Sequence, residues 1–184
     1  MKKNLLFCLA GLLLLSACNL GNKKPTNSEI IKKAAGMPGV NAGSGNFDID
    51  APSGWTRIDT SISGLKATLL MSSDASKGFR SNVNVITQAM QGMSDDSYFD
   101  ANVVGLRSNL AQFQTIDKGQ KQVNGMNARW IHYSGLNNGM MLEQMLYIIP
   151  SGGVAYLITC TSLQGQMAKD QSNFDVAVNS FKVH

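Results

Sequence analysis

Hydrophobic and polar residues alternate along much of the second half of the chain, a pattern that predicts β-strands. Four strands are expected in immediate succession, at residues 115–123, 126–136, 140–150 and 154–162. Short turns separate them, at Asn124-Gly125, Asn137–Gly139 and Ser151–Gly153, and these residue types accept positive φ. Three short turns in a row predict an antiparallel meander.

Two other segments have helical spacing. After Ser94, five large apolar residues recur three or four positions apart and would share one helix face: Phe99, Val103, Leu106, Leu110 and Phe113. Ser94 is a suitable N-cap, and Asp95 and Asp96 are better explained as first-turn charges than as an acid–base pair. A closing helix is expected over residues 165–181, with one apolar face: Met167, Phe174, Val178 and Phe181.

Strands also precede the first helix. Two short extended pieces are expected at 47–51 and 55–60, and two longer strands at 65–71 and 83–89. The resulting order, β-β-α-β-β-β-β-α after the short pieces, predicts an α+β fold. We expect a two-layer sandwich in which an antiparallel sheet has helices packed against it.

The N-terminus has the pattern of a bacterial lipoprotein signal. Lys2 and Lys3 precede an apolar stretch, Leu5–Leu15, which is too short for a membrane span of about 20 residues. Leu15-Ser-Ala-Cys18 then matches the lipobox, in which the cysteine thiol is acylated after cleavage before it. An ordinary secretory signal with Cys18 there by chance is the alternative. The expected divisions are a signal peptide at 1–17, a lipid-anchored flexible tether at 18–45 and a domain at 46–184.

The tether suggests where the protein is held. Asn19 follows the lipidated cysteine, and in enterobacteria this favours the outer membrane, here facing the periplasm. A short helix is expected over residues 28–35. Four tether lysines either attract anionic headgroups or belong to a solvated linker: Lys23, Lys24, Lys32 and Lys33.

Composition and charge limit the function classes. The chain has 184 residues, 43% hydrophobic and 15% charged, which is consistent with one folded domain. Its formal charge of +4 resides in the signal and tether, because residues 46–184 hold 10 Lys and Arg against 11 Asp and Glu. The basic patch of a nucleic-acid-binding domain is therefore missing from this sequence, and no nucleic-acid partner is expected.

No familiar catalytic or metal-binding motif occurs in the sequence, so we expect no enzyme activity, metal or cofactor. A hydrolase would need His132 as its base, but alternation places it on a strand face with Trp130 and Ser134, and no GxSxG accompanies it. Cys160 lies in an apolar, β-branched run and is expected to be a buried, inert thiol.

Methionine and tryptophan leave alternatives open. Met140, Met141 and Met145 are close in sequence, and thioethers suit Cu(I). On a strand, however, Met141 and Met145 share one face and Met140 takes the other, which favours packing. Trp55 follows Pro-Ser-Gly and is either an exposed anchor for a partner or folded back onto the sheet, which we favour.

Three segments resemble the PsbP-like and DcrB-like superfamily of photosystem II extrinsic proteins and bacterial envelope lipoproteins. They are the strand, Pro and Gly-Trp turn at 47–55, the hairpin at 123–130, and the strand and terminal helix at 155–181. The resemblance implies a PsbP-like sandwich and a small non-enzymatic module that attaches to larger assemblies. Some plant members bind metal ions, but no matching cluster of ligands occurs here, and no site residue carries across.

The sequence therefore predicts a bacterial envelope lipoprotein anchored through Cys18. Its domain would act as an accessory or assembly factor that binds an envelope protein. The alternative is a periplasmic lipoprotein that binds a small ligand or a metal. A hydrolase with His132 as its base is a third hypothesis.

Overall fold

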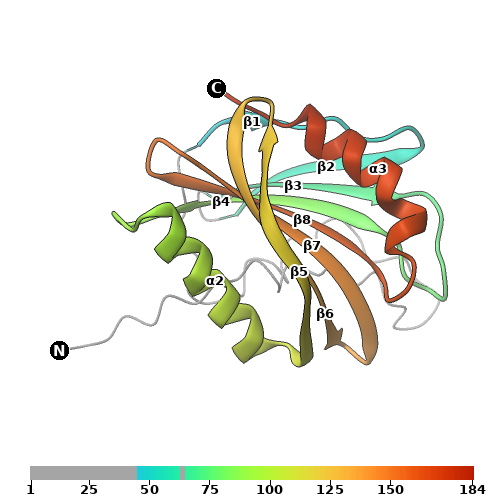
Figure 1. Ribbon diagram of the computed structural model, residues 1–184. Helices are drawn as coiled ribbons and strands as arrows, with labels where there is room; N and C mark the ends of the chain where they lie inside the picture. Colours follow the sequence, from blue (N-terminus) through green and yellow to red (C-terminus); the bar gives the residue numbers. More distant parts are fainter. Residues whose placement is uncertain (1–44, 63–64) are drawn as a thin grey trace.

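A computed structural model describes residues 45–62 and 65–184 of the chain. The main sheet has seven strands in the order β2-β3-β4-β8-β7-β6-β5, and all neighbours are antiparallel. The strands are β2 (Trp55–Ile62), β3 (Leu65–Ser72), β4 (Asn82–Ala89), β5 (Ala111–Val123), β6 (Met126–Asn137), β7 (Met140–Ser151) and β8 (Val154–Leu163). The predicted meander is confirmed, because β5, β6, β7 and β8 are successive neighbours joined by short turns (Figure 1).

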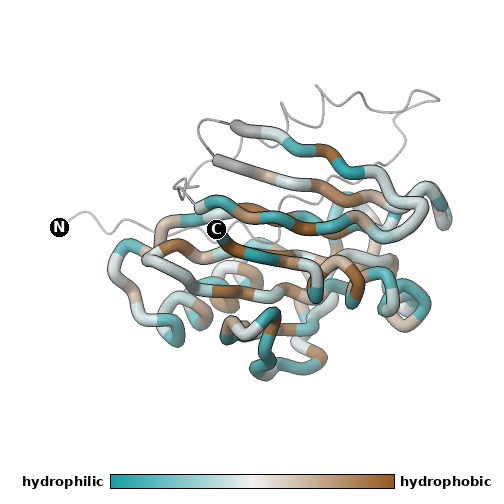
Figure 2. The backbone as a smooth tube through the Cα atoms, turned by 90° about the horizontal axis from the view of Figure 1, so that it is seen from above, coloured by the Kyte–Doolittle hydropathy of each residue, from teal (hydrophilic) through white to brown (hydrophobic). Residues whose placement is uncertain are grey.

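The turns adopt the backbone conformation that their residues favour. Asn124 and Gly125 have φ of 46° and 76°, and Asn138 and Gly139 have φ of 48° and 79°. Consecutive positive φ values match the right-handed twist of the flanking strands, which explains why Asn-Gly pairs close these hairpins. Along the strands, hydrophobic and hydrophilic residues alternate (Figure 2).

The two helices lie on opposite faces of the sheet. Helix α2 (Asp95–Asn109) packs on the face that includes Ile131, and α3 (Met167–Ser180) packs on the face that includes Trp130. We call these the α2 face and the α3 face. The α+β class and the antiparallel sheet with packed helices are confirmed, but the arrangement differs from the expected two layers because each face carries one helix. Both faces of the central strands β4 and β8 are consequently buried.

Helix α2 begins as predicted and ends earlier. The Ser94 side chain accepts a hydrogen bond from the Ser97 amide at 3.3 Å, and the helix stops at Asn109. The prediction that Phe113 continues the helix face is wrong, because Gln112 has φ of 54° and the chain has already entered β5. A register shift at this point still turns the Phe113 ring toward the α2 face, where the centres of the Phe113 and Tyr133 rings are 5.6 Å apart.

The closing helix is confirmed over a shorter span, Met167–Ser180. Met167, Phe174 and Val178 are buried on the sheet as expected. Phe181 is also buried, but as the extended residue that ends α3. The two residues that follow form β9 (Lys182–Val183), which pairs with β1 (Phe47–Asp48) in a second, two-stranded sheet. This pairing between the two ends of the domain was not predicted.

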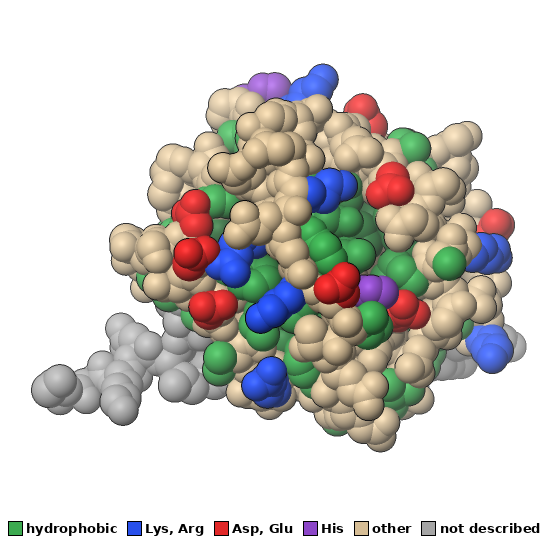
Figure 3. Space-filling model, in the orientation of Figure 1, with side chains coloured by type: hydrophobic (Ala, Val, Ile, Leu, Met, Phe, Trp, Pro, Cys, Tyr) green, Lys and Arg blue, Asp and Glu red, His purple; other side chains and the backbone are tan. Residues whose placement is uncertain are grey.

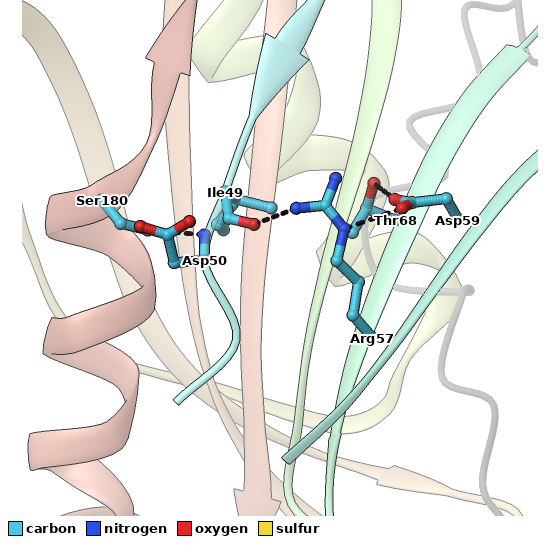
Figure 4. Close-up of polar contacts among 6 residues, drawn as sticks. All are labelled: Ile49, Asp50, Arg57, Asp59, Thr68 and Ser180. Carbon is cyan, nitrogen blue, oxygen red and sulfur yellow. Dashed lines mark hydrogen bonds and ion pairs between the residues drawn. The ribbon is translucent and has the colours of Figure 1, made fainter. Parts of the chain in front are cut away.

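A polar cluster fixes the edge strand β2 to the segment after β1 (Figure 4). The Arg57 side chain donates to the Ile49 carbonyl and, at 2.7 Å, to Asp59, which also accepts from the Thr68 hydroxyl at 2.7 Å. The hydrogen bond to Asp59 raises the pKa of Arg57, against the opposing effect of burial. Because Arg57 and Asp59 are paired with each other and each also binds a neighbouring segment or strand, we interpret this cluster as structural.

Candidate functional site

His132 is part of a structural link between strands. Its Nε2 lies 2.8 Å from Glu143 Oε1, and Glu143 Oε2 accepts a hydrogen bond from the Gly165 amide at 2.8 Å. The pair therefore connects β6 and β7 to the turn that precedes α3. Register places His132 on the α3 face with Trp130 and Ser134, as alternation predicted. A histidine whose Nε2 is held by a carboxylate with a second fixed partner is well placed for support of the fold.

Cys160 is fully buried on the α3 face, as predicted. Burial raises the pKa of its thiol, the charge of Asp175 raises it further, and the charge of Lys121 lowers it. Met145 packs in the core cluster of the α3 face, whereas Met140 packs against Phe79 and Leu142 in another cluster. Within residues 45–62 and 65–184, no three His, Cys, Asp or Glu side chains are grouped to hold a metal ion.

A groove lies on the α3 face between β5 and α3. Its floor includes Trp130 and Met145, both half-buried, and the buried ring of Tyr147. In the space-filling view a hollow with hydrophobic side chains opens here, and charges of both signs and a histidine lie around it (Figure 3). The indole of Trp130 lies over Gly119 of β5, where a Cβ would come within 2.8 Å of the ring. The absence of a side chain at Gly119 therefore leaves the space on edge strand β5 that the indole occupies.

Opposite charges flank the groove. The Lys121 ammonium on β5 lies 5.3 Å from the centre of the Tyr147 ring. Asp175 on α3 is held by the Gln171 amide at 2.9 Å. Burial raises the pKa of the Tyr147 hydroxyl, and the charges of Cys160 and Asp175 raise it further. The groove thus combines an apolar floor with one cation and one anion, a composition suited to protein contacts.

A cavity of about 180 Å³ lies near the start of α3, apart from the groove. Three separate segments surround it: the turn before β2 together with Trp55, the connection from β3 to β4 over residues 72–81, and the first half of α3. Trp55 is half-buried and meets Phe174 edge-on, with ring centres 6.0 Å apart. The expectation that Trp55 folds back toward the sheet is therefore met in part, and its ring also lines this cavity.

The wall formed by residues 72–81 is held in one conformation. Ser76 and Phe79 exchange two backbone hydrogen bonds of 2.8 and 2.9 Å across a two-residue turn. Arg80 donates to the carbonyls of Ser72 and Ser73, which fixes the base of this loop. A wall made rigid by its own hydrogen bonds is ordered before any ligand arrives.

The opposite wall is anchored by Asp170. Its Oδ2 accepts hydrogen bonds from the hydroxyls of Ser81 and Ser162, each at 2.5 Å. These bonds join α3 to β8 and to Ser81, the residue before β4, and they orient the carboxylate. The side chains of Gln166, Lys169 and Asn173 line the same wall. Sequence reasoning did not find this site, since its residues come from three separate segments, at 53–55, 72–81 and 163–173, and follow no motif.

Several predicted features lie outside the described residues: Cys18, the signal and tether, and the short helix expected over 28–35. In the part of the chain that the structure describes, no helix is long and apolar enough to cross a membrane. Asp95 and Asp96 are first-turn residues of α2. Arg129 forms an ion pair with Asp96, and its guanidinium carbon lies 4.2 Å from the centre of the Phe99 ring. The two aspartates serve the helix start, as predicted.

Comparison with known proteins identifies the family. The model for the PsbP-like proteins matches residues 48–183, nearly all of the described domain. The chain belongs to the PsbP-like family. This confirms the resemblance inferred from its opening strand, central hairpin and terminal helix. A search of curated proteins returns no match.

Solved structures share the PsbP-like fold at low sequence identity. A protein of unknown function from Pseudomonas aeruginosa, PA94, a putative regulator in its own description, has a TM-score of 0.57 and 12% identity, over 75% of this chain and 96% of its own. LpqN of Mycobacterium tuberculosis, described as involved in cell envelope biogenesis, has a TM-score of 0.54 and 17% identity, over 89% and 99%. Cyanobacterial PsbP from Synechocystis sp. PCC 6803 has a TM-score of 0.51 and 16% identity, over 80% and 97%.

Proposed function

We propose that this PsbP-like protein is a lipid-anchored, non-enzymatic accessory protein of the bacterial cell envelope, which works by binding an envelope protein. The groove on the α3 face carries this proposal. It presents a half-buried tryptophan and a methionine between Lys121 and Asp175. Tryptophan is enriched among the residues that contribute most to protein interfaces, and methionine adapts to a partner's shape.

The occupant of the groove is a segment of a partner protein with a large apolar side chain and charges of both signs. The apolar floor would bury that side chain, and the partner's anion and cation would face Lys121 and Asp175. Opposite charges on the two sides of the groove disfavour nucleic acid and anionic lipid surfaces, which present one sign only.

The anchor and the location rest on the lipobox at Cys18 and on the structural likeness to LpqN, a protein described as involved in cell envelope biogenesis. Acylation of Cys18 with two or three chains would hold the domain stably at a membrane surface. Asn19 favours the outer membrane. In cells, Cys18→Ala should move the protein from the membrane fraction to the soluble one. Retention of Cys18→Ala in the membrane fraction would contradict an anchor at this residue.

Binding through the groove can be tested by affinity purification from intact cells after short-arm crosslinking. Reversing both rim charges, with Lys121→Glu and Asp175→Lys, should abolish recovery of the partner. Lys118→Glu lies on the same strand but on the α2 side and serves as the matched control. If the wild type, the double variant and Lys118→Glu all recover the same partner equally, the partner does not bind in the groove.

A small-ligand role is the second candidate function, and the cavity near the start of α3 favours it. Polar side chains dominate its lining, its walls are fixed by hydrogen bonds, and Trp55 and Phe79 provide apolar surface. The groove and the cavity lie at different places on the domain and share no residue, so the two roles can be tested separately.

A further inference from the structure

The cavity near the start of α3 is small. Its volume of about 180 Å³ is below the range of about 300–1,000 Å³ that is usual for drug-sized ligands. It therefore suits a single ring with its substituents. Trp55 gives it an aromatic wall whose orientation is fixed by the edge-on contact with Phe174. An aromatic wall favours the C–H face of a ring ligand over an open polar chain.

The polar groups of the cavity both donate and accept hydrogen bonds. Amide side chains come from Gln166 and Asn173, and hydroxyls come from the serines of the turn before β2 and of the 72–81 loop. Asp170 uses Oδ2 for Ser81 and Ser162, and among the described residues Oδ1 has no hydrogen-bond donor. Each amide offers a donor and an acceptor that can contact neighbouring hydroxyls of a ligand, and the free oxygen of Asp170 can accept from another.

The charges of the cavity exclude strongly charged ligands. Its lining contains Lys169 as a cation against Asp74 and Asp170 as anions. An anion such as phosphate would meet two carboxylates. The described residues contain no group of three His, Cys, Asp or Glu side chains, so a metal cation is not the favoured ligand. The nearby guanidinium of Arg80 is already bound to backbone carbonyls.

We infer that this cavity binds one neutral sugar ring, either free or as a residue of a glycan. The ring lies against Trp55, and its hydroxyls exchange hydrogen bonds with Asn173, Gln166 and Asp170. This inference rests on the second candidate function and specifies its ligand class. It does not depend on the groove.

The test uses the full chain purified in detergent, titrated with glucose, galactose, mannose and N-acetylglucosamine. Saturation-transfer NMR detects binding and isothermal titration gives the Kd. At least one of these sugars should bind saturably, while inorganic phosphate should not. Asn173→Ala should weaken binding about fivefold, which corresponds to the loss of one hydrogen bond.

Asn179→Ala is the matched control, since Asn179 is an exposed asparagine on the same helix outside the cavity. It should leave the Kd unchanged. Lys121→Glu alters the groove and should also leave the Kd unchanged, so failure of the partner proposal would not affect this result. No binding of any of the four sugars would overturn the inference. Equal Kd values for Asn173→Ala and Asn179→Ala would also overturn it, because the sugar would then bind elsewhere.

Discussion

Two buried tyrosines on the α2 face provide a paired test of how hydrogen bonding of a buried hydroxyl affects stability. Tyr98 and Tyr133 are 1% and 0% exposed. The Tyr98 hydroxyl donates to the Gln88 side chain at 2.5 Å, whereas the Tyr133 hydroxyl has no hydrogen-bond partner among the described residues. Burial raises the pKa of Tyr133, so this hydroxyl stays neutral. Phenylalanine at each position removes one oxygen atom and keeps the ring.

The two substitutions should change stability in opposite directions. A buried hydroxyl without a partner costs about 1–3 kcal/mol. Tyr133→Phe removes that cost and should raise the free energy of unfolding by about 1 kcal/mol or more. Tyr98→Phe removes a hydrogen bond and leaves the Gln88 oxygen buried without this donor. This change should lower the free energy of unfolding by about 1–3 kcal/mol.

Urea unfolding followed by circular dichroism measures both effects, with the midpoint shifting at constant slope. For a domain of this size, about 1 kcal/mol corresponds to about 3–4 °C in Tm. Tyr133→Phe should therefore melt higher than the wild type and Tyr98→Phe lower. If Tyr133→Phe loses as much stability as Tyr98→Phe, the Tyr133 hydroxyl has a partner and the reasoning is refuted.

Three further substitutions or reactions test other parts of the structure. Ser94→Ala should lower the free energy of unfolding by about 1 kcal/mol through loss of the α2 N-cap, and an unchanged urea midpoint would refute that role. Gly119→Ala should lower the free energy of unfolding by about 1–3 kcal/mol and shift the tryptophan fluorescence, because the new Cβ would displace the Trp130 indole. A wild-type emission spectrum and a wild-type urea midpoint would contradict this packing. Cys160 should react with a thiol reagent only after unfolding, since it is buried and its pKa is raised; labelling of the native domain at this residue would show that it is accessible.

The elements that depend on local chemistry could be predicted from the sequence. Asn-Gly pairs fix the hairpins of the meander, and Ser94 starts α2 where a capping residue is needed. Phe113 could not be placed, because helical spacing continues past Asn109 while the positive φ of Gln112 ends the helix. Amphipathic patterns show that a helix buries one face, but they do not say which side of the sheet it covers.

Features that depend on distant contacts could not be predicted. The pairing of Phe47 with Val183 joins residues 136 positions apart, and nothing in either dipeptide indicates the other. The cavity brings together three segments, and the link from Asp170 to Ser81 spans 89 residues. The groove depends on where α3 lies relative to β5. Trp130 and Met145 have the alternation of core residues, yet both are only partly buried in the folded domain.

Site-specific photo-crosslinking in intact cells tests the central claim most directly. A photoreactive amino acid replaces Asp175 at the groove or, as a control, its exposed neighbour Val176 or the exposed Val104 on α2. The proposed function predicts one envelope protein crosslinked from position 175 and from neither control position, with the crosslink lost when Lys121 is changed to Glu. No crosslink from position 175, or the same product from all three positions, would contradict partner binding through the groove.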